Sequence, residues 1–309
     1  MAVYGPTVTH PALERTWRPR FAVDPWLTLA PLRHGIGDPT MRIERAAIWR
    51  AARTVRGPAT LHLRFAAGEV LASAWGPGAE AALDGLPRLL GADDDPDAFV
   101  PPPGVLREIV ARRHGLRFTR SDWVMGALLP AIIEQKVTGD EAGRSFRGLV
   151  RVHGEPAPGP GGLVLPPTPE ALARLPYWAY HPVGLEQRRA DTIRRAASRA
   201  GWLEDGILGR PVEALERLRQ LPGIGPWTAA ETVRIAMGDP DAVSVGDFHL
   251  PHLVSWMLAG EPRGTDDRML ELLSPFAGQR ARVVRLLELS GQRAPRYGPR
   301  LAGRSIASM

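Results

Sequence analysis

The residues with the clearest chemical potential lie in the stretch 221–250, which reads LPGIGPWTAAETVRIAMGDPDAVSVGDFHL. Its Gly-Asp-Pro sequence at 238–240 stops a helix, a short β-prone run follows at 242–245, and Asp247 then stands between Gly246 and Phe248. An aspartate held at the entrance of a loop or helix is suited to electrostatic work, because its carboxylate can stabilise a developing positive charge. The alternative is that Asp247 only caps a helix beginning at Phe248, and the two roles can coexist.

Upstream of Asp247 the sequence predicts two helices joined by a tight turn. Residues 212–220 carry apolar side chains at helical spacing, the PGIG sequence at 222–225 forms the turn, and Pro226 suits the first position of the second helix. We expect both glycines of the turn to allow positive φ, so that its amides and those of the second helix point at an anion such as phosphate. An ordinary helical corner with a glycine cap is the alternative.

The hairpin and the aspartate together resemble the helix-hairpin-helix superfamily of DNA glycosylases, in which LPGIG-x-x-TA is followed by an aspartate in a Gly-Asp or Asp-Asp context. In this chain that aspartate is Asp247. Within the superfamily the resemblance is closest to the bacterial 3-methyladenine DNA glycosylase II branch, because Trp227 stands where that branch has its pocket tryptophan. Lyase-type relatives such as endonuclease III have a lysine nucleophile at the same position.

The resemblance implies a monofunctional glycosylase that flips a damaged base, expected to be alkylated, out of duplex DNA and hydrolyses its N-glycosidic bond. Asp247 would stabilise the oxocarbenium-like transition state and orient or deprotonate the attacking water. Trp227 would stack on the flipped base, and a cationic purine would add a cation–π term of roughly 0.5 to 2 kcal/mol. A glycosylase for deaminated or oxidised bases and a non-catalytic duplex-binding module are the alternatives.

Two further residues are expected in the base pocket. Glu231 stands four residues after Trp227, where the glycosylase II branch has a tyrosine. Since residues i and i+4 share a helix face, its carboxylate can lie beside the indole and attract a cationic base; a solvent-facing glutamate is the alternative. Phe248, directly after Asp247, is the other expected pocket residue.

The resemblance also implies contacts between the hairpin and DNA. The amides of Gly223, Ile224 and Gly225 and the hydroxyl of Thr228 would hold phosphates. Relatives bind a monovalent cation at backbone carbonyls of this turn, and the corresponding carbonyls here belong to Arg219, Leu221 and Ile224.

A second DNA contact is expected at residues 133–137, which match the family pattern I-x-x-Q-x-V near the minor groove. Gln135 is the glutamine of this pattern. The family places a leucine or similar wedge directly after it, whereas this chain has Lys136. A lysine could fill the gap left by a flipped base only with its alkyl stem, and a solvated lysine at a helix end is the alternative.

Composition agrees with a nucleic-acid partner. The 309 residues include 39 Lys and Arg against 33 Asp and Glu, and the formal net charge is +6. The absence of cysteine excludes disulfides, a catalytic thiol and cysteine-ligated zinc or iron–sulfur centres. We expect no cofactor and no metal held by side chains. With no leader-like N-terminus and no apolar run of membrane-spanning length, a monomeric, cytoplasmic, nucleoid-associated protein bound to damaged double-stranded DNA is expected.

The predicted fold class is α+β. Residues 59–65 alternate apolar and polar side chains and pair with 70–75, weaker strands are expected at 41–45 and 48–55, and a helix at 79–90. We therefore predict an N-terminal domain with a small antiparallel sheet at 1–100, of which the first 20 residues are a loose lead-in, and we identify no chemistry there.

A charged, proline-rich seam precedes an all-helical glycosylase domain at 105–290, and a basic, mobile tail is expected at 291–309. Within the helical domain, Ser121 is expected to cap a helix running to Thr138, Thr168 a helix over 170–175, and a further helix to span 185–200. The aromatic run at 176–181 is interpreted as core packing rather than as a pocket wall.

Overall fold

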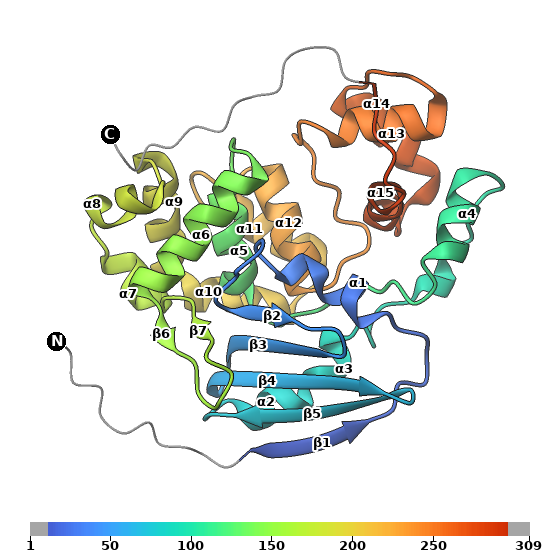
Figure 1. Cartoon of the computed structure of the whole chain (residues 1–309). Helices are drawn as coiled ribbons and strands as arrows, with labels where there is room; N and C mark the ends of the chain where they lie inside the picture. The colour runs from blue at the N-terminus through green and yellow to red at the C-terminus, as the bar shows by residue number, and fades with distance from the viewer. Residues whose placement is uncertain (1–11, 296–309) are drawn as a thin grey trace, which may run out of the picture.

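A five-stranded antiparallel sheet forms the first part of the chain, where the sequence predicts a small antiparallel sheet with four strands (Figure 1). The computed structural model describes residues 12–295, so most of the tail predicted at 291–309 lies outside the described residues. The spatial order of the strands is β1-β5-β4-β3-β2. Their bounds are β1 (Leu13–Trp17), β2 (Met41–Ile43), β3 (Ala47–Thr54), β4 (Gly57–Ala66) and β5 (Glu69–Trp75).

The hairpin between β4 and β5 follows the predicted pairing. Ala66 lies opposite Glu69, and Ala67 and Gly68 form the two-residue turn with φ of 51° and 76°. Positive φ at both central residues matches the right-handed twist of the flanking strands.

The interpretation of the first 20 residues as a loose lead-in is wrong from Leu13 onward. Strand β1 pairs with β5 along its whole length, with Leu13 opposite Ala74 and Trp17 opposite Val70. Four of its five residues are exposed, because β1 is an edge strand. It therefore lacks the alternation of apolar and polar side chains that marks a half-buried strand.

One predicted helix over 79–90 is divided in the structure. Helix α2 (Ala79–Asp84) ends at Gly85, and α3 (Leu86–Leu89) follows with a proline in its first turn. The expected apolar side chains of this segment are buried against the sheet residues.

The remaining chain is mainly helical, and two short strands pair within the long loop after α6 (Figure 1). The α-helices and short strands not yet given are α1 (Pro25–Leu29), α4 (Val105–Arg112), α5 (Val124–Ile133), α6 (Gly139–His153), β6 (Glu155–Pro156), β7 (Val164–Leu165), α7 (Pro169–Arg174), α8 (Tyr177–Tyr180), α9 (Gln187–Ala197), α10 (Ala200–Glu204), α11 (Pro211–Arg219), α12 (Pro226–Ala236), α13 (Leu250–Ala259), α14 (Asp266–Leu273) and α15 (Arg280–Leu289). Short 3₁₀ turns cover Ala30–Leu32, Pro96–Ala98, His181–Val183, Asp205–Leu208 and Ser274–Phe276.

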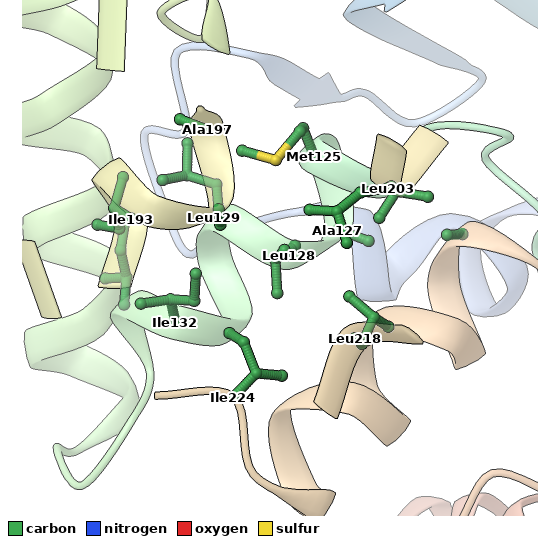
Figure 2. Packing of buried hydrophobic residues seen from close by; sticks show 14 of the residues in the cluster. Met125, Ala127, Leu128, Leu129, Ile132, Ile193, Ala197, Leu203, Leu218 and Ile224 are labelled. Atoms are coloured by element: carbon green, nitrogen blue, oxygen red, sulfur yellow. The ribbon is translucent and has the colours of Figure 1, made fainter. Parts of the chain in front are cut away.

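Helix α5 lies at the centre of the helical part. Every residue of α5 except Gly126 is buried, because the helix is apolar on all sides and is surrounded by α6, α9, α10 and α12. Figure 2 shows Leu128 and Ile132 of α5 near Ile193 of α9, Leu218 of α11 and Ile224 of the hairpin turn.

The predicted bounds of this central helix are wrong at both ends. Ser121 does not cap it; instead the amides of Val124 and Met125 donate to the Glu204 carboxylate of α10 at 2.8 and 2.9 Å. Thr138 begins the next helix rather than ending this one, since it forms a capping box with Glu141. A cap supplied by a residue so distant in the sequence leaves no local pattern.

Other helix starts follow their local signals. Thr168 caps α7 as predicted, and its hydroxyl accepts a hydrogen bond from the Ala171 amide at 3.1 Å. Helix α9 is shorter than the predicted 185–200 and covers Gln187–Ala197. In the aromatic run at 176–181, Tyr180 is buried as expected, whereas Trp178 is 74% exposed.

A buried ion pair joins the seam after the first part of the chain to α15. The side chains of Arg282 and Asp94 are 3% and 0% exposed, and their guanidinium and carboxylate groups form a hydrogen bond. The second carboxylate oxygen of Asp94 accepts from the Phe118 amide at 2.9 Å. Burial raises the pKa of Asp94, and the charge of Arg282 opposes this effect.

We predict that Asp94→Ala lowers the free energy of unfolding by about 3–5 kcal/mol, because it leaves the Arg282 charge buried without a partner. Asp84→Ala is the matched control, since it removes an exposed aspartate that pairs with Arg15. It should cost no more than about 1 kcal/mol. Urea unfolding of both variants measures the difference, and equal losses would contradict a structural role for the buried pair.

Candidate active site

The predicted helical hairpin is present, with α11 and α12 joined by the turn at 220–225. Pro226 occupies the first turn of α12, as expected. Gly223 has φ of +96°, and a Cβ atom placed on it would lie 2.3 Å from the Thr192 hydroxyl of α9. Glycine at 223 is therefore required by the fold itself.

The expectation of positive φ at Gly225 is wrong. Gly225 is the N-cap residue of α12, with φ of −93° and ψ of 178°, so its backbone is extended. A Cβ atom at this position would meet no atom of the protein within 4 Å. Nothing in the described structure thus requires a glycine here, whereas a bare backbone leaves its surface open to an external partner.

Gln135 connects the end of α5 to this hairpin. Its amide nitrogen donates to the Gly223 carbonyl at 3.0 Å and to the Thr228 hydroxyl at 2.8 Å. Three of the residues expected to contact DNA therefore lie together. The next residue, Lys136, is exposed and has φ of +57°, a conformation that is uncommon for a residue with a side chain.

Asp247 is held by three hydrogen-bond donors. One carboxylate oxygen accepts from the amides of His249 and Leu250 at 2.7 and 2.9 Å, and thereby caps α13. The other oxygen accepts from the indole nitrogen of Trp227 at 3.0 Å. The alternative in which Asp247 caps a helix beginning at Phe248 is wrong in its bounds, because α13 begins at Leu250 and its N-cap residue is His249. Asp247 nevertheless binds the first amide of α13, and the Trp227 contact fixes the direction of the carboxylate relative to α12.

A cavity of about 390 Å³ opens beside this pair of residues. Trp227, Glu231 and Asp247 line one part of it, and Pro130 and Glu134 of α5 line another. Further lining residues come from the N-terminal part of the chain and from α15, including His34, Arg50, Arg285 and Glu288.

Glu231 lines the cavity, but both of its carboxylate oxygens are occupied within the protein. One accepts from the Arg234 guanidinium and the other from the Ser244 hydroxyl. Burial lowers the pKa of Arg234, but Glu231 together with Glu288 and Glu134 more than offsets this effect, so the pKa rises overall. The charge of Glu231 is thus neutralised within the wall of the cavity.

Phe248 does not line this cavity. Its side chain is 71% exposed, and its ring lies edge-on to His249 and His252, with centroids 5.0 and 6.4 Å away. The structure therefore separates Phe248 from Trp227, Glu231 and Asp247, which it brings together.

Sequence reasoning missed the acidic and basic residues that complete the cavity. Burial raises the pKa of Glu134 to about 7, and the nearby Glu231 adds to this effect. Burial lowers the pKa of His34 to about 4, although Asp38 opposes the change. For Glu134 the only available signal was its place beside Gln135 in the I-x-x-Q-x-V motif; for His34 no local pattern exists.

Within the part of the chain that the structure describes, no group of three or more His, Cys, Asp or Glu residues could hold a metal ion. At the hairpin turn, the Leu221 carbonyl accepts from the Ile224 amide at 3.0 Å. A monovalent cation at the carbonyls of Arg219, Leu221 and Ile224 stays a prediction.

None of the helices between residues 12 and 295 has the length and apolar character of a membrane span.

Two curated relatives are similar to part of the chain, although no protein-family model matches it. A probable bifunctional transcriptional activator/DNA repair enzyme AlkA of Mycobacterium tuberculosis is 30% identical over 173 residues, which are 53% of this chain and 34% of the relative. DNA-3-methyladenine glycosylase 2 of Escherichia coli is 28% identical over 172 residues, 55% of this chain and 58% of the relative. The chain thus spans about a third and somewhat over half the length of these relatives.

Solved structures share the fold over nearly the whole chain. A 3-methyladenine DNA glycosylase from Archaeoglobus fulgidus aligns with a TM-score of 0.75 at 20% identity, covering 90% of this chain and 98% of that one. An 8-oxoguanine glycosylase/lyase from Clostridium acetobutylicum, solved with double-stranded DNA, aligns with a TM-score of 0.61 at 14% identity over 80% and 95%. These comparisons confirm the resemblance to helix-hairpin-helix DNA glycosylases and the α+β fold class with its helical core.

The two hairpin glycines should respond differently to substitution. We predict that Gly223→Ala lowers the free energy of unfolding by about 1–3 kcal/mol, because alanine disfavours positive φ and its methyl group overlaps Thr192. Gly225→Ala should cost no more than about 1 kcal/mol, since it fits the existing backbone. Thermal and urea unfolding test this contrast, and a larger loss at position 225 would overturn it.

Proposed function

We propose that the chain is a monofunctional DNA glycosylase that flips an alkylated base from double-stranded DNA and hydrolyses its N-glycosidic bond. The observation that carries the proposal is the Trp227–Asp247 hydrogen bond at the wall of a cavity large enough for a purine. The similarity to relatives described as 3-methyladenine DNA glycosylases supports the same reading.

The flipped nucleotide would place its base in the cavity and its sugar at Asp247. As the glycosidic bond lengthens, positive charge develops on the sugar, and the fixed carboxylate stabilises it without reorganising. The attacking water then loses its proton to this carboxylate. The three donors to Asp247 hold its oxygens in place, so the α13 cap and the indole serve as the support of the reacting group.

The base would be received by the indole ring of Trp227, which lines the cavity while its nitrogen is engaged with Asp247. An alkylated purine carries its own positive charge and leaves as a neutral base, so a general acid is not essential. The ring face also attracts such a base through a cation–π interaction of roughly 0.5 to 2 kcal/mol.

Duplex DNA would bind across the hairpin and the end of α5. The extended Gly225 and the first amides of α12 provide donors for a phosphate, and Gln135 holds this turn against α5. Phosphate contacts of this kind position the protein without reading sequence. The exposed Lys136 lies beside Gln135, where its alkyl stem would enter the space left by the flipped base.

We extend the proposal to the organisation of the chain. Residues 1–100 and 105–290 would be the two structural units, and the enzyme would act as a monomer on damaged DNA in the cytoplasm. The cavity requires both units, because His34 and Arg50 line it together with Trp227 and Asp247.

Asp247→Asn should reduce base release by at least about a hundredfold while binding to lesion-containing DNA is retained, since only the transition state needs the negative charge. Asparagine can still accept the hydrogen bonds that cap α13. Single-turnover release from a 3-methyladenine duplex, together with the Kd of the same duplex, measures the two effects. Retention of more than about a tenth of the activity would remove Asp247 from the catalytic role.

The products should be a free base and an intact abasic strand. Trp227 occupies the position of the lyase lysine, and Lys136 is the single lysine of the sequence. Borohydride treatment during turnover should therefore trap no covalent protein–DNA adduct. If an adduct forms, Lys136→Arg distinguishes a lysine Schiff base from attack by the N-terminal amine, and either result would contradict the monofunctional assignment.

Release of 3-methyladenine separates this proposal from its alternatives. A non-catalytic duplex-binding protein would release no base from any duplex. A glycosylase for deaminated or oxidised bases would act on hypoxanthine or 8-oxoguanine and leave 3-methyladenine in place.

A further inference from the structure

Four carboxylates line the cavity, and three of them are engaged within the protein. Asp247 is held by Trp227 and two amides, Glu231 by Arg234 and Ser244, and Glu288 by Arg285 at 3.2 Å. The fourth, Glu134, has no side-chain hydrogen bond or ion pair to any residue of the described chain. It is therefore the acid whose oxygens are available to a molecule in the cavity.

The position of Glu134 is fixed by its neighbours along the chain. Its amide donates to the Pro130 carbonyl at 2.9 Å at the end of α5, and the next residue, Gln135, is bonded to the hairpin turn at two points. Glu134 also borders a second cavity of about 210 Å³, lined by Gly139 and Gly143 of α6. Helix α5 and the contact between Gln135 and the hairpin turn thus fix the position of Glu134, which borders both cavities.

The charges around Glu134 come from several elements. Helix α12 contributes Glu231 and Arg234, which raise and lower the pKa of Glu134 respectively after the larger effect of burial. Arg33 and His34 precede β2, Arg50 lies on β3, and Arg285 and Glu288 lie on α15. The Asp247 carboxylate completes the set.

The carboxyl group of Glu134 changes its charge near neutral pH. Its pKa is about 7, so the carboxyl is largely protonated at pH 6 and largely ionised at pH 8. His34, with a pKa of about 4, is neutral over this interval, and Arg50, with a pKa lowered by burial to about 10, stays charged.

We propose that Glu134 is the specificity-determining residue of the cavity, and that its carboxylate contacts the flipped base and favours a positively charged base over a neutral one. This inference rests on the proposed glycosylase activity. It assigns the selection of cationic bases to Glu134 rather than to Glu231, whose charge is already neutralised by Arg234.

The chemistry of the two protonation states differs. An ionised carboxylate only accepts hydrogen bonds, and it attracts a cation. A protonated carboxyl group also donates a hydrogen bond, so it suits the edge of a neutral purine, which carries both donors and acceptors. The ionised fraction of a group with a pKa of about 7 increases about tenfold between pH 6 and pH 8. The preference for a cationic base should increase by up to the same factor.

The test compares kcat/KM for release of 3-methyladenine and of hypoxanthine from otherwise identical duplexes at pH 6, 7 and 8. In the wild-type protein the ratio of the two values should rise by about fivefold to tenfold from pH 6 to pH 8. In Glu134→Gln the ratio should be independent of pH and close to the wild-type value at pH 6. A rise that persists in Glu134→Gln, or a ratio that is flat in the wild-type protein, would overturn the inference.

The matched control is Glu80→Gln, which removes the same charge from an exposed residue of α2 and should preserve the wild-type rise. Glu231→Gln separates the two acidic residues of the cavity: a pH dependence abolished by that substitution and retained in Glu134→Gln would assign selection to Glu231 instead. Because glutamine has nearly the shape of glutamate, Glu134→Gln and Glu80→Gln should unfold at the wild-type temperature. Glu231→Gln should unfold at a lower temperature, since it removes the charge that pairs with Arg234.

A second measurement keeps this inference separate from the proposed activity. If neither the wild-type protein nor a variant releases a base, the proposed function fails. The affinities of Asp247→Asn for the same two duplexes then replace the rates as the measured quantity. The inference predicts that the 3-methyladenine duplex binds more tightly at pH 8 than at pH 6. Loss of this difference when Glu134→Gln is added would support a contact between Glu134 and the flipped base. Affinities that do not depend on pH or on residue 134 would contradict it.

Discussion

The complete burial of α5 is the constraint on which the rest of the structure depends. Burial of an apolar helix is favourable, so α6, α9, α10 and α12 pack around it. Its first amides are satisfied by Glu204 and its last turn leads directly into Gln135, which bonds the hairpin. One buried helix thus positions both the hairpin turn and one wall of the cavity.

Asp247 shows how a single carboxylate can have a structural role and also be placed for the proposed chemistry. Its hydrogen bonds to the α13 amides and to Trp227 would be expected of a helix cap alone, yet they also orient the group beside an open cavity. Preorganised charge of this kind needs no rearrangement as a cation forms. The hydrogen bonds that orient the carboxylate also stabilise the start of α13, so the folding of this helix helps to hold the charged group in place.

Features with local causes were predictable from the sequence. The β4–β5 hairpin, the Thr168 cap and the Pro226 helix start each depend on a few neighbouring residues. The start of α5 was not predictable, because its cap comes from Glu204, and neither was β1, an exposed edge strand without alternation. The same limit applies to the site: the stretch 221–250 supplied Asp247 and Trp227, whereas Glu134, His34 and Arg50 join them only through tertiary packing.

Residues near the start of the chain line the cavity, although the hairpin lies far away in the sequence. The shape of the cavity and the hairpin therefore depend on different parts of the sequence. The hairpin that is proposed to contact DNA lies after residue 210, whereas His34 and Arg50 line the cavity from a distant part of the sequence. A substitution at His34, in the segment between α1 and β2, would therefore change the shape of the cavity and leave the hairpin residues unchanged. Under the proposed function, the selectivity of the cavity and the binding of DNA would thus depend on separate parts of the sequence.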